Sequence, residues 1–382
     1  MVELLSAIGD SWDKRLDGVA RDVYHTAGYH RYSATSGAGE PYLIVVGDSD
    51  RGLAWPYLLR RVAAVEGLEE SDATDIGSVY GYPGPIAWGC GPEDPFLAAA
   101  WAELRETWRS QGAVAAFTRF HPLLRNVDLA RGFEEVPRAA RSLRRTDRGP
   151  ILARGQTVSI DCTLDDEQAR AAYARTLRQE IAQGRRAGLI TEADEVFSEI
   201  SAFVRLYEAT MARNRAASSY AVSRDDVVRL RHELDGNLHL LVTRLDGVVV
   251  GAGLFTEFDQ VVQAHLVGTD DRQRRLSPLK VMLDDARRWA RGRGNRILHL
   301  GGGRGGRKDS LLAFKGRFSP RRHDFHAGHW ILDPARYAEL VDRRSRYVAT
   351  RGLVRVDPNW LPAYRAPPLD ADPVVEVPSG GA

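Results

Sequence analysis

The sequence contains few cysteines, few lysines and no long apolar run. Its two cysteines, Cys90 and Cys162, lie far apart among 382 residues, which excludes a disulfide framework and a cysteine-rich metal cluster. It has no run of about 18 apolar residues and no charged-then-apolar leader at the N-terminus. We therefore expect a reduced, cytoplasmic protein with neither a membrane span nor a metal. The formal net charge is only +2, so the chain as a whole is no polyelectrolyte binder, and we expect no DNA partner.

Lysine is the rare basic residue of this chain. Only four of the 53 Lys and Arg residues are lysines, at positions 14, 280, 308 and 315. In a chain so biased toward arginine, a retained lysine indicates a need for a compact, mobile ammonium group. Three of the four lie in the segment 299–316 or on the predicted helix before it, so this segment is the first candidate site.

The segment combines a glycine cluster with a short predicted helix. An apolar run over 297–300 predicts a strand that stops where the glycines begin. Clustered glycines are typical of a tight backbone that another group approaches closely. Asp309 or Ser310 can cap the helix that follows, and this helix presents Phe314 and Lys315.

The second half of the chain shows a clear order of helices and strands. The periodicity predicts helices over 166–187, 196–215, 224–235, 278–292 and 309–315, and strands over 238–244, 248–255, 260–268, 296–300 and 324–332. This order is that of GCN5-related N-acetyltransferase (GNAT) domains, so this half resembles one.

The first half repeats this order more faintly. We predict helical segments within 11–30 and over 93–111 and 122–131, with strands over 42–46, 52–65 and 113–120. A strand-helix-strand-helix run thus recurs at 86–131 and 260–315, which indicates an internal duplication. We expect an α/β fold of two tandem GNAT-like domains with mixed, mostly antiparallel sheets, at 1–155 and 156–335. A helix and a Pro-rich tail at 336–382 should pack on the first domain and end in a disordered tip.

Two further regions carry candidate binding residues. The loop over 72–85 concentrates aromatic residues, glycines and prolines, and Arg-Phe-His at 119–121 follows at a predicted strand end, where open α/β sheets place ligands. A rigid aromatic loop and a packed core histidine are the structural alternatives. In the second half, a helix ends near Arg213 and Tyr220 and could line a groove. The substrate-binding candidates are Asp75, Tyr80, Tyr82, Arg119, His121, Arg213, Tyr220, Gly302, Gly303 and Ser310.

These motifs together resemble the Fem family, over roughly residues 1–345. Its members are double-GNAT aminoacyltransferases known from the formation of peptidoglycan interpeptide bridges. The resemblance implies an aminoacyl-tRNA donor, an amine acceptor, an amide product and no cofactor. It also implies that Phe314 and Lys315 match the Phe-Lys pair at the reaction centre. The long coiled-coil arm of some members is missing, which favours a small metabolite over a peptidoglycan precursor peptide as acceptor.

The sequence of the turn before the helix at 278–292 is not typical of a coenzyme A binding site. GNAT domains that use acyl-CoA bind its pyrophosphate on the backbone of a glycine-containing turn at this place. The sequence 272–278 contains no glycine, and Pro278 removes an N–H donor. Side chains could instead contact phosphates of a tRNA acceptor end or of a phosphorylated acceptor. The phosphate-binding candidates are Arg274, Arg275, Lys280 and Lys308.

The chemistry of aminoacyl transfer asks for positioning and for positive charge near the developing oxyanion or the leaving oxygen. Lys315 suits this electrostatic role, and Phe314 could either stack on a tRNA base or pack in the core. The base that deprotonates the acceptor could be Asp75, Asp309, His121 or the substrate itself. An acyl-CoA N-acyltransferase and a non-catalytic protein that binds RNA or a partner are the alternative functions.

Overall fold

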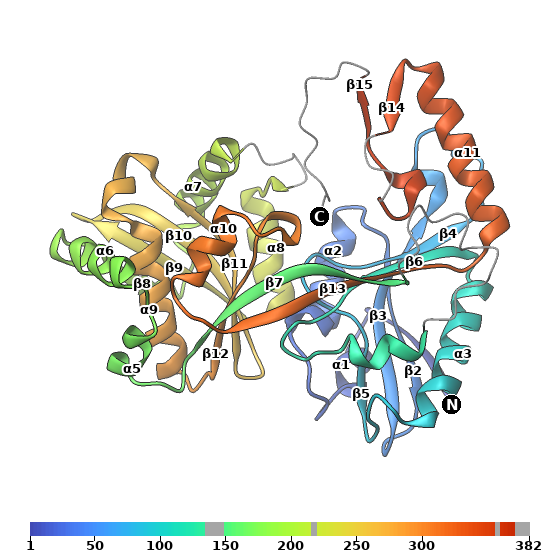
Figure 1. Cartoon of the computed structure of the whole chain (residues 1–382), viewed down its shortest axis with the longest axis horizontal. Coiled ribbons are helices and arrows are strands. Elements are labelled where there is room, and N and C mark those ends of the chain that lie inside the picture. Colours follow the sequence, from blue (N-terminus) through green and yellow to red (C-terminus); the bar gives the residue numbers. More distant parts are fainter. Residues whose placement is uncertain (134–148, 215–219, 356–359, 371–382) are drawn as a thin grey trace. The chain divides into compact units, whose positions relative to one another are not determined.

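The computed structural model describes residues 1–133, 149–214, 220–355 and 360–370. The chain divides into two compact units, unit 1 (Met1–Arg154 with Phe325–Ala382) and unit 2 (Gly155–Asp324). Each unit contains helices and a mixed, mostly antiparallel set of strands, as expected (Figure 1). The expected disorder at the tip of the tail concerns residues 371–382, which lie outside the described residues.

Unit 1 is built on a six-strand path with one additional strand. The order is β1 (Val2–Ser6), β2 (Glu40–Gly47), β3 (Gly52–Arg61), β4 (Thr74–Gly77), β6 (Ala113–Arg119) and β13 (Arg322–Ile331), with β5 (Ile86–Trp88) paired to β3. The helices are α1 (Ser11–Arg15), α2 (Ala27–Thr35), α3 (Pro95–Ser110) and α11 (Pro334–Thr350), with 3-10 turns η1 (Val23–His25), η2 (Val62–Ala64), η3 (Asp128–Phe133) and η7 (Ala363–Arg365). A small pair, β14 (Leu353–Arg355) and β15 (Pro368–Asp370), follows α11.

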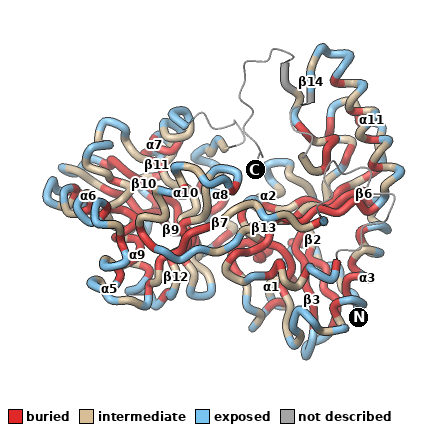
Figure 2. Tube along the Cα trace, in the orientation of Figure 1, coloured by how far each residue is buried: buried red, intermediate tan, exposed pale blue. Residues whose placement is uncertain are grey.

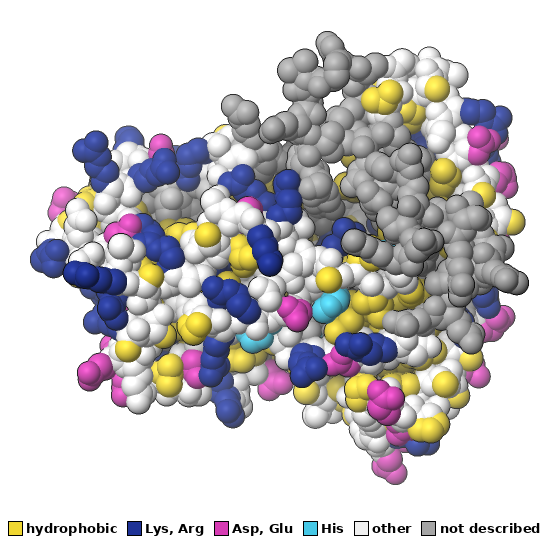
Figure 3. Space-filling view, in the orientation of Figure 1, with side chains coloured by type: hydrophobic (Ala, Val, Ile, Leu, Met, Phe, Trp, Pro, Cys, Tyr) yellow, Lys and Arg dark blue, Asp and Glu magenta, His cyan; other side chains and the backbone are white. Residues whose placement is uncertain are grey.

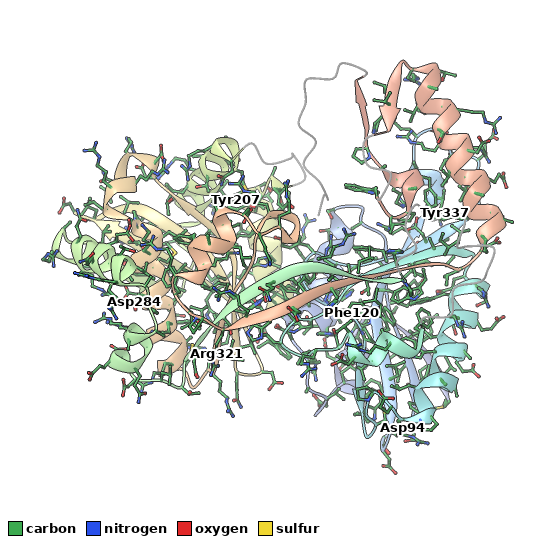
Figure 4. The ribbon with its side chains drawn as sticks, in the orientation of Figure 1. Asp94, Phe120, Tyr207, Asp284, Arg321 and Tyr337 are labelled. Carbon is green, nitrogen blue, oxygen red and sulfur yellow. The ribbon has the colours of Figure 1, made fainter. Side chains whose placement is uncertain are left out.

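Helix α3 shows how the sequence specifies these elements. Asp94 caps its first turn by accepting a hydrogen bond from the N–H of Phe96 (2.8 Å), and Pro95 occupies the first helical position (Figure 4). Trp101 and Trp108 lie on the same face of α3, two helical turns apart, and both are fully buried. Both pack edge-on against Trp55 of β3, with ring centres 5.3 and 5.1 Å away. This aromatic cluster forms the centre of the core of unit 1.

Unit 2 follows a second six-strand path. Its order is β7 (Ile151–Asp161), β12 (Ile297–Gly302), β11 (Val261–Thr269), β10 (Val248–Phe258), β9 (Leu238–Leu245) and β8 (Ile190–Ala193). The helices are α5 (Asp166–Ala171), α6 (Arg175–Arg186), α7 (Ile200–Arg213), α8 (Arg224–Leu234), α9 (Pro278–Gly292) and α10 (Ser310–Gly316), with 3-10 turns η5 (Asp271–Leu276) and η6 (Arg304–Gly306). Buried residues run along the central strands and the inner side of α9 (Figure 2).

The two units have the same strand pairing. In unit 1, β4 and β6 are parallel and joined through α3, and in unit 2, β11 and β12 are parallel and joined through α9. All other pairings that are described along the two paths are antiparallel. The duplication expected from the sequence is therefore visible in the topology. Its first copy begins at β4 rather than at the residue 86 where the sequence analysis placed it.

Several predicted elements differ from the observed ones. The helix expected over 166–187 is interrupted between α5 and α6, where Tyr173 turns inward and donates its hydroxyl to Asp284 (3.1 Å). The helix expected over 122–131 is only the 3-10 turn η3. The last strand, β13, was expected in the second domain, yet from Phe325 onward it lies in unit 1 and pairs with β6. The predicted domain end at 335 therefore shifts to 324, and helix α11, in the segment predicted to pack on the first domain, lies in unit 1.

Candidate active site in unit 2

The end of β12 and the glycine cluster form a tightly packed turn. Gly301 has a φ of +72°, which favours glycine. A Cβ on Gly303 would lie only 2.1 Å from the carbonyl oxygen of Arg307, and a Cβ on Gly155 of β7 only 1.7 Å from that of Gly306. Larger residues would therefore break this turn.

Asp309 closes the turn and begins α10. Its carboxylate accepts hydrogen bonds from the backbone N–H groups of Leu312 and Arg304, both at 2.9 Å. Burial raises the pKa of Asp309, but these donors outweigh it and hold the pKa below its ordinary value. Asp309 is therefore a charged cap that orders the segment and a weak base. Ser310, the first helical residue, is exposed.

Lys315 points back onto the end of β12. Its Nζ donates to the carbonyl oxygen of Gly302 at 2.7 Å. Desolvation lowers the pKa of Lys315 to about 8, although the charge of Asp309 acts in the opposite direction. The side chain is partly buried, so its ammonium is held at the end of a strand. Phe314 packs edge-on against Phe318, with ring centres 5.7 Å apart, at the border of the unit 2 core.

The parallel strands of unit 2 part beside this turn. β11 and β12 are paired only from Val261–Ile297 to Gln263–His299. Beyond that point β11 carries an irregularity at His265, and β12 continues into the glycines. Ligands of open α/β folds bind outside the carboxyl ends of strands. The place at which β11 and β12 separate is therefore a candidate position for a ligand.

A basic surface connects the turn before α9 with the glycine segment. Arg213 at the end of α7 lies 3.5 Å from Asp271 of η5, and Arg304 of η6 donates to Asn214 at 3.4 Å. The exposed basic residues of this surface are Arg213, Arg272, Arg274, Arg275, Arg304, Arg307 and Lys308. Lys and Arg side chains are visible over much of unit 2 (Figure 3). Arg304 and Arg307 were not among the predicted phosphate-binding residues, although both interrupt the glycine cluster.

Lys280 and Tyr220 do not join this surface in the same way. The Nζ of Lys280 contacts Glu180 at 2.9 Å and the hydroxyl of Ser277 at 3.0 Å. These contacts tie α9 to α6, so its predicted phosphate role is less suited to the geometry than that of Arg274 and Arg275. Tyr220 is partly buried and directly follows residues 215–219, which the structure does not describe.

The predicted residues of the aromatic loop and of the 119–121 segment meet in unit 1. The ring of Tyr82 packs edge-on against Tyr24 and His121, with centres 5.8 and 6.1 Å away. Arg119 donates to the carbonyl oxygen of Val79 at 3.2 Å. Tyr80 is 46% exposed, so within this group it is the residue most open to a ligand.

His121 is enclosed within this cluster. Its Nε2 lies 2.7 Å from Asp22, and its Nδ1 accepts the backbone N–H of Leu124 at 3.2 Å. The side chain is 1% exposed. With both ring nitrogens engaged, His121 matches the core-histidine alternative, and it offers no lone pair to a substrate.

Asp75 lies elsewhere in unit 1 and is completely buried. Arg60 and Arg365 donate to its carboxylate at 2.5 and 2.6 Å, and the hydroxyl of Tyr364 donates at 3.0 Å. These bonds attach the turn η7 to β4. A carboxylate that is enclosed in this way does not contact a substrate. Of the groups predicted to deprotonate the acceptor, only the substrate itself remains suited to that role.

Comparisons with known proteins concern the fold. A family model described as an acetyltransferase (GNAT) domain matches residues 171–309. A solved structure of FemX superposes with a TM-score of 0.65 at 13% identity, covering 88% of this chain and 99% of that one. This chain has a Fem-like double GNAT fold. A conserved protein of unknown function from Bacteroides thetaiotaomicron superposes with a TM-score of 0.51 at 9% identity, covering 79% and 88% of the two chains.

Two further findings concern relatives and membranes. No curated protein matches the sequence. Within the described residues, every helix is too short or too polar to cross a membrane.

Proposed function

We propose that this protein transfers an aminoacyl group from an aminoacyl-tRNA to an amine and so forms an amide. The fold and the GNAT match support an acyltransferase. The observation that carries the finer proposal is Lys315, held at 2.7 Å from the carbonyl oxygen of Gly302 where the parallel strands part. The Fem-like motifs of the sequence supply the choice of donor.

The turn before α9 supports tRNA over coenzyme A. Ser277, the residue at the helix start, has a φ of +56°, and Pro278 follows with no N–H to offer a phosphate. Arg274 and Arg275 are exposed beside it. A nucleic acid bound through side chains needs no glycine-lined cradle, so this turn suits the phosphates of an acceptor stem.

Lys315, Asp309 and the glycines have different roles in the proposed aminoacyl transfer. The neutral amine attacks the ester carbonyl carbon, the C–O bond to the ribose breaks, and the ribose oxygen takes up a proton. Lys315, as an ammonium, stabilises negative charge on the carbonyl or leaving oxygen. Asp309 and the glycines hold the segment rigid, which places that charge without reorganisation during the reaction. The acceptor is an amine, either a small metabolite or a precursor peptide.

An acyl-CoA N-acyltransferase is the second candidate, because the matched family model describes acetyltransferases. RNase treatment separates the two. A coupled reaction with total charged tRNA and a panel of amines should lose its amide product after RNase if tRNA is the donor. Product that survives RNase and depends on added acyl-CoA would replace the proposal with the second candidate. Binding of tRNA without product from any amine would indicate a non-catalytic protein.

A further inference from the structure

An ion network joins helices α5, α6 and α9 of unit 2. Its members are charged side chains that each lie at most 3.2 Å from an opposite charge, namely Asp166, Arg170, Arg185, Asp284, Asp285, Arg287 and Arg288. Asp284, which contacts all of these arginines, is labelled in Figure 4. Four guanidinium groups thus face three carboxylates, so the network carries an excess of positive charge.

No further carboxylate of these helices offsets this excess. Glu167 on α5 is exposed. Glu180 on α6 is paired with Lys280 and Arg317, which lie outside the network. The excess charge therefore remains where the three helices meet.

Arg287 is the buried cation of the network. Its side chain is 0% exposed, and its Nη2 contacts Asp166 at 2.5 Å. Nε and Nη1 have no hydrogen-bond partner within the described part of the chain. The hydroxyl of Tyr173 lies beside the guanidinium but donates its hydrogen to Asp284, and one oxygen atom cannot serve all the hydrogens on Nε and Nη1. Buried N–H groups in folded proteins are nearly always paired, so this side chain needs a further acceptor.

The missing partner must be an acceptor with negative charge. Nε of Arg185 is also buried without a hydrogen-bond partner among the described residues. The buried atoms of the network that lack a partner are all guanidinium nitrogens, and these only donate. Burial lowers the pKa of Arg287, but Asp166, Tyr173 and Asp284 outweigh it and hold the pKa above its ordinary value. Arg287 is therefore a permanent cation, and an anion satisfies it better than a neutral acceptor.

The exposure of the arginines limits the size of such an anion. The side chains of Arg170, Arg185 and Arg288 are 39, 30 and 31% exposed, so ions from solvent reach the outer part of the network. Arg287 is enclosed behind them, beneath α5. A donor in this position suits a small ion rather than the backbone of a nucleic acid.

We propose that this network binds one small monovalent anion of the chloride type, held by Arg287 with Arg185 beside it. The anion accepts the unpaired N–H groups and neutralises the excess charge. It thereby stabilises the packing of α5 and α6 on α9, the helix that follows the basic turn η5. The site contains none of the residues assigned to aminoacyl transfer, so it does not depend on the identity of the donor.

Anomalous diffraction locates the anion directly. In crystals of the full-length protein grown with sodium bromide, we expect one bromide ion within hydrogen-bond distance of Nε or Nη1 of Arg287. Crystals grown with sodium gluconate are the matched control and should show no anomalous peak at that place. Bromide on exposed arginines alone, as an adventitious ion only, overturns the proposal, and so does an ordered water at Arg287 in the bromide crystals.

A chloride titration tests the site in solution. At constant ionic strength, kept with sodium gluconate, an increase from about 1 to about 100 mM chloride should raise the thermal midpoint by about 3 °C. General screening does not produce this shift, because it depends on ionic strength alone and weakens ion pairs. Arg287→Met should remove the shift. Arg244→Met is the control, because Arg244 is paired with Glu192 and Glu199 elsewhere in unit 2, and it should keep the shift.

Each outcome decides the proposal. Arg287→Met leaves Asp166 paired with Arg288, and Asp284 paired with Arg170 and Arg185, and Arg287→Lys provides a second variant that keeps the charge without the planar donors. An equal chloride shift in both variants and the wild type, or no shift in the wild type, overturns the anion site. Failure of the wild type to form an amide would overturn the proposed function instead and leave this site unaffected.

Discussion

Units 1 and 2 share a strand order but differ at the point where their parallel strands end. In unit 2, pairing stops at Gln263–His299, and the glycine segment with Lys315 follows. In unit 1, the corresponding place is filled by the protein's own groups. Arg119 at the end of β6 donates to Val79, and Asn126 donates to the carbonyl oxygen of Pro83 at 2.7 Å. At the corresponding place the same scaffold thus carries the glycine segment with Lys315 in unit 2 and a packed aromatic cluster in unit 1.

The segment before the helix that joins the two parallel strands also differs between the units. Helix α9 begins directly after the basic turn η5, whereas α3 follows a loop that contains β5 and begins at the acidic cap Asp94. A helix N-terminus attracts anions, and basic side chains strengthen that attraction while an aspartate cap already satisfies it. The two units therefore share an architecture, but in the described residues a basic turn precedes the connecting helix only in unit 2, as the proposed binding of phosphates there requires.

The largest effect is expected from the buried aspartate that stabilises unit 2. Asp284 is completely buried, and it accepts from Arg185 at 2.8 Å and Arg170 at 3.2 Å (Figure 4). Asp284→Asn should lower the free energy of unfolding by about 3–5 kcal/mol, because it removes the counter-charge of the buried Arg287, 3.9 Å away, and of the half-buried Arg170 and Arg185. Urea unfolding with hydrogen exchange should show this loss in unit 2. Asp75→Asn is the equivalent test of unit 1, and equal loosening of both units by either variant would contradict the division into independent cores.

The next effect concerns catalysis in unit 2 alone. Lys315→Ala should lower kcat about a hundredfold with little change in stability, since removal of one such donor costs about 3 kcal/mol of transition-state stabilisation. Lys14→Ala is the control, because the ion pair of Lys14 with Asp10 is highly exposed on both sides. Steady-state kinetics of amide formation measure both variants. Full turnover by the Lys315 variant would remove the electrostatic role assigned to that residue.

Unit 1 should be sensitive to acid because it buries neutral histidines. Desolvation lowers the pKa of His25 to about 3 and of His30 to about 4. The unfolded chain binds protons at these residues below pH 6.5, while the folded unit does not. The free energy of unfolding should therefore fall as the pH drops from about 6.5 toward 4, by up to about 1.4 kcal/mol per pH unit for each histidine. His30→Phe should reduce this slope in pH-dependent urea unfolding, and an unchanged slope would argue against a neutral buried His30.

The smallest effect is expected on tRNA affinity. Arg274→Gln with Arg275→Gln should weaken tRNA binding several-fold and reduce the slope of log K against log salt concentration by about 1.8, for two lost phosphate contacts on a double-helical stem. Arg186→Gln, an exposed arginine on α6, should leave both unchanged. Filter binding at several salt concentrations makes the comparison. An equal change in the control would indicate unspecific attraction by the whole unit.

Local sequence patterns predicted much of the secondary structure correctly. The limits of α8, α9 and β9 fall within a residue or two of those predicted, because amphipathic periodicity and caps act locally. The strands β1, β4 and β8 have only four or five residues, too few for a clear alternation, and all three were missed. The assignment of β13 to unit 1 depends on long-range pairing with β6, which no local pattern reveals.

The candidate site was predictable to a similar extent. The scarcity of lysine and the glycine cluster identified Lys315 and Asp309. In the structure both bind the backbone of the glycine segment, Lys315 at Gly302 and Asp309 at Arg304. The sequence could not show that His121 faces Asp22, 99 positions away in the chain. Nor could it show that Ser159 and His323, 164 positions apart, form a pair. Such contacts arise only when segments that are distant in the sequence become neighbours in the fold.

The most direct test follows a labelled amino acid from isolated charged tRNA into the product. Mass spectrometry of a reaction that contains only this protein, tRNA charged with ¹³C-labelled amino acids and an amine should detect an amine that has gained one labelled aminoacyl group. The proposed function requires this product from the wild type, and about a hundredfold less of it from Lys315→Ala. A labelled product that forms equally well without the protein, or its absence with every amine while acyl-CoA yields an amide, would contradict it.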